Sequence, residues 1–359
     1  MIGNQDILTW LRQEDPAALG DLWAQADAIR QAAVGPAIHL RALVEISNHC
    51  VRQCAYCGLR SGNGDLMRYR MPADEIVEVA RRAGKLGCGT VVLQGGEDPQ
   101  LTIDMIAGVV RRIKQSTPLA VTLSLGERSL DELFAWKAAG ADRYLLRFET
   151  SDRELYDRIH PPHRQFSDRI EMLRQIKAMG YEAGGGVMVG IPGQTYDILA
   201  QDIATFRRLD LDMIGVGPFL PHPQTPLGQA DVQYAPASRQ VAPTDLMVYK
   251  VIALARLVCP TANIPATTAL ATINRAQGRE LAWQRGANVV MPNFTPMRFR
   301  RLYEIYPAKA CIGEGGDQCV GCLGRRIRSI GRCVGTGSGS RSTAPLSARA
   351  APLICLEPS

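Results

Sequence analysis

Short apolar segments alternate with longer amphipathic ones over most of the chain. The short runs are rich in β-branched residues and predict strands, whereas apolar positions that recur every three or four residues predict helices. Strands are expected at 43–47, 90–94, 120–125, 143–148, 186–189, 213–219, 263–267 and 289–291. The helices between them are expected at 72–86, 103–115, 130–139, 167–179, 195–209, 244–258 and 278–285.

Eight such strands in about 250 residues match a (β/α)₈ barrel of the TIM type in number and length. The alternative is a doubly wound open sheet, in which a Gly-rich dinucleotide-binding turn would follow the first strand. Here the first strand runs into a cysteine-containing loop instead. The predicted fold class is therefore α/β, with a (β/α)₈ barrel.

The remaining segments divide the chain into four parts. Residues 1–41 form an N-terminal segment with two short helices, the second of which opens at Pro16. The barrel is expected at 42–300, followed at 301–334 by a C-terminal extension that carries a second cysteine motif. Residues 335–359 are rich in Gly, Ser, Ala and Pro and have no period of 2 or 3.6. They are interpreted as a disordered or loosely draped tail, or as an artefact of expression or sequencing.

The composition says more about the cellular compartment of the protein than about its function. The net charge of +6 is modest, and much of it comes from arginines near the C-terminus, so it does not indicate nucleic-acid binding. No apolar run approaches the roughly 20 residues that span a bilayer, and the N-terminus lacks an apolar signal core. We therefore expect a cytoplasmic protein without a membrane segment. In that compartment, ten cysteines favour metal or redox chemistry over disulfides.

The strongest chemical signal is a cysteine motif directly after the first expected strand. Cys50, Cys54 and Cys57 have the spacing CxxxCxxC, with an aromatic residue just before the last cysteine. Three thiolates leave one iron of a 4Fe–4S cluster open, where a full site would supply four ligands. The spacing is typical of the radical S-adenosylmethionine (SAM) superfamily, in which the open iron binds SAM and the cluster cleaves it to a 5′-deoxyadenosyl radical. The alternatives are a zinc site without its fourth ligand and a group of buried thiols.

A Gly-rich turn follows the second expected strand. It contains Gln94, Gly95, Gly96 and Glu97. Paired glycines permit a ligand to approach the backbone closely, and Glu97 offers an acceptor. In radical SAM enzymes a Gly-Gly-Glu turn at this place binds the methionyl amine of SAM, although alone it could be any turn that ends a strand.

A second group of cysteines lies beyond the eighth strand. Cys311, Cys319 and Cys322 fall in a polar, Gly-rich region that is interpreted as a loop. This spacing favours a second iron–sulfur site, most simply a 2Fe–2S cluster, and Cys333 is either a fourth ligand or an idle thiol. Cys88 and Cys259 are expected to be buried as small apolar residues.

Polar side chains also occur within the expected strands. Arg147 and Glu149 alternate on the fourth strand, so both should face one side of the sheet. An unpaired arginine in an apolar run is costly to bury, and an anionic ligand inside the barrel would explain it. The alternative is an Arg–Glu pair that only satisfies itself.

With these motifs in place, the chain resembles the HydE family, the radical SAM maturases of FeFe-hydrogenase, from about residue 40 to about residue 325. The resemblance rests on the strings CAYCGLR, YRM, VVLQGGEDP, VTLSLGE, AGADRYLLRFET, MVGIPGQT, GPFLPHPQTPL, NIPATTA and GANVVMPNFTP. Methylornithine synthase and biotin synthase share the barrel and the first cysteine motif. The ending of the chain from residue 330 does not resemble the family.

The resemblance implies an activity and a site. It implies a radical attack on a small iron complex that carries cysteine, carbon monoxide and cyanide, which leads toward the dithiomethylamine-bridged di-iron centre of the hydrogenase. It also implies HydG and HydF as partner maturases and a separate electron donor. The positions implied to line the SAM and substrate cavity are Gln94, Gly95, Gly96, Glu97, Thr122, Arg147, Glu149, Arg169, Met213 and Tyr303. Gly95 stands where at least one relative has Ser.

Two other functions remain possible from the sequence. One is a radical SAM mutase or sulfur-inserting enzyme that acts on an amino-acid-like substrate. The other is an iron–sulfur scaffold without SAM chemistry, although a carrier would not need Arg147 and Glu149 or the Gly-Gly-Glu turn.

Overall fold

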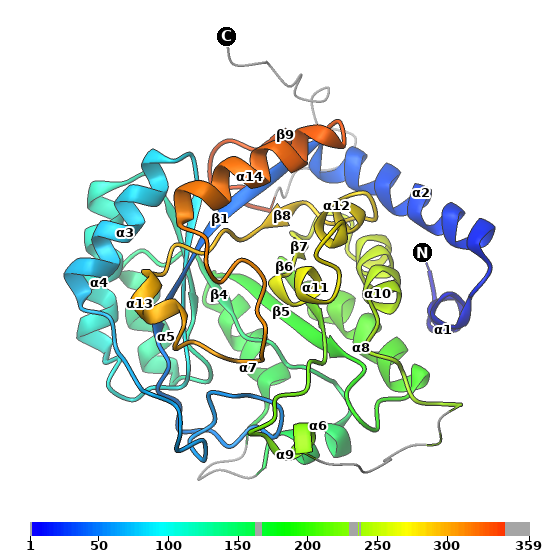
Figure 1. Cartoon of the computed structure of the whole chain (residues 1–359), viewed down its shortest axis with the longest axis horizontal. Coiled ribbons are helices and arrows are strands. Elements are labelled where there is room, and N and C mark those ends of the chain that lie inside the picture. The colour runs from blue at the N-terminus through cyan, green and yellow to red at the C-terminus, as the bar shows by residue number, and fades with distance from the viewer. Residues whose placement is uncertain (1, 162–166, 230–235, 237, 342–359) are drawn as a thin grey trace.

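Eight parallel strands form the centre of the protein, with helices packed around them (Figure 1). The computed structural model describes residues 2–161, 167–229, 236 and 238–341. The strands are β1 (Ala37–Ser47), β2 (Thr90–Gly95), β3 (Ala120–Ser124), β4 (Arg143–Leu145), β5 (Glu182–Val189), β6 (Met213–Pro218), β7 (Pro265–Ala266) and β8 (Val289–Val290). All eight predicted strands are confirmed in position, and the (β/α)₈ class is correct.

The strands follow one another around a nearly closed barrel in the order β6-β5-β4-β3-β2-β1-β8-β7. The first and last strands of this order approach one another through a parallel bridge between Met213 and Asn263. There the Ile214 amide donates to the Asn263 carbonyl over 2.9 Å. The carboxyl ends of all strands therefore point to one mouth of the barrel, here called the upper mouth, and their amino ends to the lower mouth.

Several helices around the barrel begin at residues with capping side chains. Thr102, Ser129 and Thr195 each accept a hydrogen bond from a backbone amide in the first turn of their helix. The helices are α3 (Ala73–Lys85), α4 (Ile103–Ser116), α5 (Leu130–Ala138), α6 (Arg153–Ile159), α7 (Arg169–Ala178), α8 (Tyr196–Arg208), α9 (Pro226–Gln229), α10 (Asp245–Val258), α11 (Thr268–Ile273), α12 (Gly278–Trp283) and α13 (Met297–Arg300).

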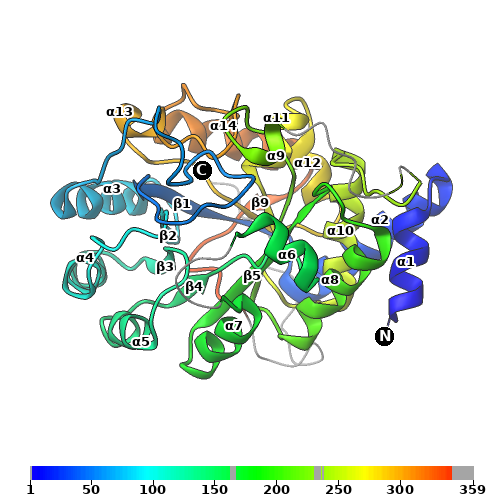
Figure 2. The same cartoon turned by 90° about the horizontal axis from the view of Figure 1, so that it is seen from below.

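Two helices precede the barrel, as predicted. They are α1 (Asn4–Arg12) and α2 (Pro16–Val34), and Asp15 caps the second by accepting from the Ala18 amide over 2.8 Å. Helix α1 packs against α8 and α10, and α2 packs against α10 (Figure 2). The buried Lys250 ammonium on α10 donates to the Leu11 carbonyl over 2.9 Å and closes the end of α1. None of the described helices is long and apolar enough to cross a membrane.

The structure differs from the sequence analysis at both ends of the barrel. β1 begins at Ala37, inside the segment assigned to the N-terminal helices, because β9 (Cys333–Val334) pairs with its first residues. The region of Cys319 and Cys322 is not a loop but part of α14 (Gly316–Ser329), whose glycines concealed the helical pattern. Residues 335–341 are not a loose tail, because they make specific contacts across the lower mouth. Residues 342–359 lie outside the described part of the chain.

Candidate active site

The three cysteines of the first motif lie together at the upper mouth, in the loop that follows β1. Cys54 is buried, Cys50 and Cys57 are partly buried, and all three are free thiols. Burial is the main cause that raises the pKa of each thiol, to about 12 for Cys54. The charges of neighbouring thiols raise the pKa of Cys54 and Cys57 further, and the charge of Glu97 does the same for Cys50. Without metal these side chains are therefore protonated. Iron would have to displace the protons, and it would then relieve the mutual repulsion of three thiolates.

A single arginine fixes the shape of the cysteine loop. The Arg68 guanidinium donates to the backbone carbonyls of Asn48, Leu59 and Arg60 over 2.6–2.8 Å. It bridges the two sides of the loop that contains the cysteines. The thiols are consequently preorganised by backbone contacts and do not depend on metal alone for their position.

The Gly-Gly-Glu turn packs directly under this loop. A Cβ atom at Gly96 would lie 2.3 Å from the His49 carbonyl oxygen and 2.7 Å from the Cβ of Cys50. No side chain fits there, so Gly96 is required by the cysteine loop itself. A Cβ at Gly95 would meet its nearest atom only at 3.4 Å. Gly95 lines the cavity described below, where its missing side chain leaves room for a ligand.

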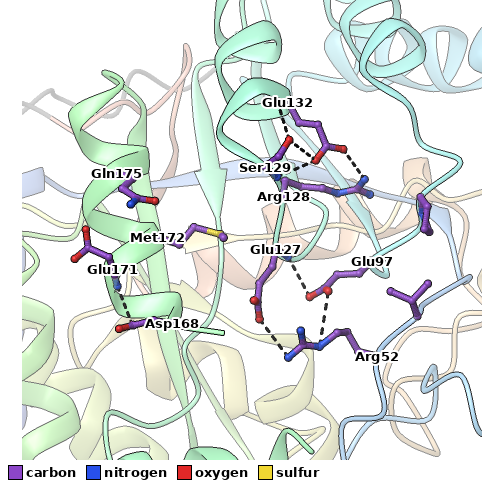
Figure 3. A pocket seen from close by; sticks show the side chains of 12 residues that line it. Arg52, Glu97, Glu127, Arg128, Ser129, Glu132, Asp168, Glu171, Met172 and Gln175 are labelled. Carbon is purple, nitrogen blue, oxygen red and sulfur yellow. Dashed lines mark hydrogen bonds and ion pairs between the residues drawn. The ribbon is translucent and has the colours of Figure 1, made fainter. Parts of the chain in front are cut away.

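Four charged side chains form a network beside the cysteines. Arg169 donates to Glu127 over 2.8 Å and lies 3.7 Å from Glu97, and Arg52 lies 3.5 Å from Glu127 and 3.8 Å from Glu97. Figure 3 shows Arg52 pointing between the two carboxylates. An open groove of about 600 Å³ lies against this network, between the start of α5 and helix α7. Burial raises the pKa of Glu97, and the cations oppose that shift.

Arg52 and Glu127 were missed by the sequence analysis. Arg52 lies between the first two cysteines of the motif, and Glu127 ends the string VTLSLGE after the third strand. The sequence signal that could have identified them is their position next to a motif. That Arg52 and Glu127 pair with each other can be seen only in the folded structure.

Two adjacent cavities lie inside the upper mouth and the barrel. The upper cavity has a volume of about 270 Å³ and is lined by Cys57, Gly95, Glu149 and Arg169. The inner cavity has a volume of about 150 Å³ and is lined by Thr122 and Met213, among others. The side chains of Gln94 and Arg147 line both. Most of the residues predicted for SAM and substrate thus line one of these two cavities, whereas Gly96, Glu97 and Tyr303 support the walls from behind.

Arg147 and Glu149 lie just beyond the end of β4. Glu149 has a φ of 64°, an unusual value for a residue other than glycine, which turns its side chain into the upper cavity. Its carboxylate lies 3.1 Å from the Arg147 guanidinium. The Arg–Glu pair that the sequence analysis considered therefore exists. Nevertheless Arg147 faces both cavities, and its Nε atom has no hydrogen-bond partner among the described residues.

The segment after α13 closes one side of the cavity. Tyr303 is buried, and its hydroxyl accepts from the Gln94 amide over 3.2 Å. It does not itself line either cavity, whereas Tyr306 lines both. A buried ion pair between Lys309 and Glu45 holds the segment against β1. Tyr303 therefore positions Gln94. Tyr306 is the aromatic residue that lines both cavities, while Tyr56 lines the upper one alone.

The second cysteine group lies on the outside of the barrel, near the start of α14. The Arg279 guanidinium contacts the Cys311 sulfur at 3.7 and 3.8 Å. Burial is the main cause that raises the pKa of Cys319 to about 11, whereas Arg279 opposes the shift. Cys319 and Cys322 are three residues apart on α14 and so share a face of the helix.

Neither cysteine group forms a site for a single metal ion. Among the described residues, no three His, Cys, Asp or Glu side chains converge on one point where an ion could bind. In an iron–sulfur cluster the thiolates bind different irons and therefore stand farther apart. Three free thiols, one buried and two partly buried, beside two arginines fit a 4Fe–4S cluster, because such a cluster is anionic and takes thiolate ligands.

A barrel with three clustered cysteines after its first strand defines a radical SAM enzyme. In agreement, the Radical SAM superfamily profile matches residues 44–205. The chain is 45% identical to the FeFe-hydrogenase maturase subunit HydE of Thermotoga maritima over 320 residues, which cover 89% of this chain and 88% of that protein. The chain therefore belongs to the HydE family of hydrogenase maturases.

More distant relatives share the fold. The 3-methylornithine synthase of Methanosarcina acetivorans is 28% identical over 291 residues, which cover 80% of this chain and 79% of that protein. The crystal structure of methylornithine synthase (PylB) superposes with a TM-score of 0.78 at 24% identity and covers 93% of this chain and 94% of that one. This likeness supports the barrel, not a shared substrate.

Proposed function

We propose that the protein acts on a small iron complex that carries cysteine, carbon monoxide and cyanide, on the way to the dithiomethylamine-bridged di-iron centre of FeFe-hydrogenase. The observation that carries this proposal is the position of Arg147, a cation that faces both the cavity beside the cysteines and the barrel interior. An anionic complex in the inner cavity would contact Arg147, which also faces the upper cavity, where SAM would bind.

The residues at the upper mouth would hold the cofactors. Cys50, Cys54 and Cys57 would hold a 4Fe–4S cluster, which supplies the electron that cleaves SAM to a 5′-deoxyadenosyl radical. The residues proposed to contact or support SAM are Gln94, Gly95, Gly96, Glu97, Thr122, Glu149, Arg169 and Met213. Arg169 is held by Glu127 and by the Arg147 carbonyl, 2.9 Å away, so its guanidinium is fixed before the ligand arrives.

Three side chains are proposed for the catalytic site, one that binds the substrate and two that position other side chains. Arg147 would bind an anionic group through charge-assisted hydrogen bonds. Glu149 would fix the Arg147 side chain by the 3.1 Å ion pair, and Tyr303 would fix Gln94 at the cavity wall. Because the two cavities share Gln94 and Arg147 in their walls, a radical formed at the upper mouth would arise close to a substrate in the inner cavity.

The second cysteine group is proposed to hold a 2Fe–2S cluster. Cys311, Cys319 and Cys322 would supply three of its ligands. Arg279 contacts Cys311, and the basic side chains of Arg300 and Arg326 interact electrostatically with the thiols of this group. Such a group of cations would stabilise an anionic cluster.

The wider setting is also a proposal. HydG would supply the iron complex, HydF would be a further maturase partner, and a reducing protein of the cytoplasm would supply electrons. No nucleic acid or membrane is expected to take part.

The proposed function can be tested with the reconstituted protein. Anaerobic incubation with SAM, dithionite and a synthetic iron–cysteine complex should give a new paramagnetic species that requires both SAM and the complex. Electron paramagnetic resonance would detect it. Cleavage of SAM with an unchanged iron complex, or turnover of an amino acid such as ornithine or lysine instead, would favour the mutase alternative and contradict the proposal.

A further inference from the structure

The lower mouth of the barrel is filled by the chain's own residues 335–341. The Ser338 carbonyl accepts hydrogen bonds from Thr90 over 2.9 Å and from Arg143 over 3.1 Å. The Gly339 carbonyl accepts from Asn263 over 3.0 Å and from Arg41 over 3.1 Å. Four donors from four separate parts of the barrel thus converge on two adjacent carbonyl oxygens.

The end of this segment is anchored by charge. Arg341 lies 2.7 Å from Asp210 and 2.8 Å from Asp212, and it donates to Thr261 over 2.8 Å. Between Gly335 and Arg341 the side chains are small or absent, with the sequence GTGSGSR. The segment is therefore held by polar contacts and buries almost no apolar surface. A segment of this kind can detach from its site at a low cost in free energy.

The site beneath the segment carries more positive charge than its partners neutralise. Arg143 is completely buried and pairs with Glu182 at 2.7 Å. Arg41 is also buried, yet it forms no ion pair among the described residues, and its Nε atom lacks a hydrogen-bond partner there. Burial is the main cause that lowers the pKa of Arg41, to about 9, and Arg143 adds to it. Neutral carbonyl oxygens compensate such a cation only in part.

Arg41 also connects this site to the inner cavity. Its side chain lines that cavity, where its other terminal nitrogen contacts the Met213 sulfur at 2.9 Å. The guanidinium therefore stands between the cavity and the segment 335–341. When the segment is in place, this end of the inner cavity has a polar floor made by the chain itself.

We propose that residues 335–341 are a displaceable plug in the lower mouth, and that a small oxyanion can take the place of its carbonyl oxygens on Arg41, Arg143, Thr90 and Asn263. Displacement of the plug opens a second route to the barrel interior, opposite the cysteine loop. This proposal does not depend on the substrate proposed above, and its test needs neither SAM nor a cluster.

The experiment measures cleavage by trypsin after Arg341. In the closed state Arg341 is bound to Asp210 and Asp212, so trypsin should cleave there slowly. A side chain at Gly339 would lie 2.6 Å from the His39 ring, so Gly339→Val should expel the plug and speed this cleavage about ten-fold. Mass spectrometry of the fragment that ends at Arg341 gives the rate in the full-length protein.

Two control variants separate expulsion from general strain. Gly331 has a similar positive φ of 70° but open space around it, so Gly331→Val should leave the rate near that of the wild type. His39→Ala in the Gly339→Val background removes the clash and should return the rate most of the way. Equal cleavage in the wild type and Gly339→Val, or no recovery with His39→Ala, would overturn the plug.

The oxyanion is tested in the wild-type protein with sulfate as the probe. Sulfate should speed cleavage after Arg341 more than sodium chloride does at the same ionic strength. Cleavage of a short arginine peptide in the same buffers corrects for effects on trypsin. Equal rates in the two salts would show that the site does not recognise oxyanions and would overturn that part of the proposal.

Discussion

Arg147 both forms an ion pair with Glu149 and faces the two cavities, so both interpretations of this residue from the sequence describe its surroundings. The sequence suggested either a cation for an anionic ligand or an arginine that pairs only with Glu149. The structure has the ion pair, at 3.1 Å, and also turns the guanidinium toward both cavities. The cysteines and the Gly-Gly-Glu turn could be predicted because motifs are local in sequence. Arg52, Glu127 and Arg41 could not be predicted, since their roles arise from neighbours in distant strands.

The first prediction concerns Arg147 itself. Arg147→Met keeps much of the side-chain length but removes the charge, so binding of an anionic iron complex should weaken about ten- to a hundred-fold, or about 1.4–2.8 kcal/mol. Cleavage of SAM without substrate should survive, because Arg169 and the Gly95–Glu97 turn remain. Titration of the iron complex and assay of 5′-deoxyadenosine measure the two effects.

A matched variant controls for the loss of an arginine. Arg112 forms a surface ion pair with Asp74, 2.7 Å away and far from the cavity, so Arg112→Met should change neither quantity. If Arg147→Met lowered SAM binding and substrate binding equally, Arg147 would be a structural partner of Glu149 and no more.

At the scale of elements, the apolar pattern of the sequence predicted the strands and their order. It did not predict the loops and the ends of the helices. β4 comprises only Arg143–Leu145. The regular strand pairing ends there, and Arg147 lies beyond it at the wall of the cavities. α14 was interpreted as a loop, since its glycines and charges hide a helix whose apolar face packs on the barrel. Local propensity predicts an element only where tertiary contacts do not decide it.

A second prediction concerns the turn after β2, which is tied to the segment that returns from the cysteine loop. The buried Asp98 carboxylate accepts from Arg70 over 2.6 and 2.9 Å and from Ser47 over 2.7 Å. Burial alone would raise the pKa of Asp98, but these hydrogen bonds outweigh it and lower the pKa. Its contribution to stability is therefore complete above the unfolded value of about 4 and is lost as the pH falls through the lower, folded value.

Asp98→Asn should lower the free energy of unfolding of the metal-free protein by about 2–3 kcal/mol at neutral pH. It should also reduce the loss of stability as the pH falls from neutral to below about 4. Urea midpoints across this range give both quantities. Asp74→Asn, at an exposed ion pair, is the control and should change little. An unchanged acid dependence in Asp98→Asn would refute the assignment.

The third prediction concerns the extension that contains α14. Alanine at Cys311, Cys319 and Cys322 should remove about two irons per chain and leave SAM cleavage nearly intact, since these cysteines lie outside the barrel. Iron analysis and the 5′-deoxyadenosine assay check both parts. An iron content equal to that of the wild type would show that these cysteines hold no cluster.

At the scale of the whole molecule, the barrel places its cofactor residues at one mouth and closes the other with its own chain. The first feature follows from parallel strands, whose carboxyl ends must share a mouth, and could be predicted. The closure by residues 335–341 could not, because that segment lacks any periodicity and is held by contacts with residues about 80 to 300 positions away. The sequence of this segment is typical of a disordered tail, and its position is fixed by hydrogen bonds and ion pairs at the lower mouth of the barrel.

The most direct test of the account is SAM cleavage without the three cysteines at the upper mouth. With dithionite under anaerobic conditions, the reconstituted Cys50→Ala/Cys54→Ala/Cys57→Ala protein should form no 5′-deoxyadenosine above the protein-free background, because no thiolate remains to hold the cluster. Cys88→Ala/Cys259→Ala, which alters two buried cysteines outside both motifs, should retain the activity of the wild type. Formation of 5′-deoxyadenosine by the triple variant would contradict the central claim.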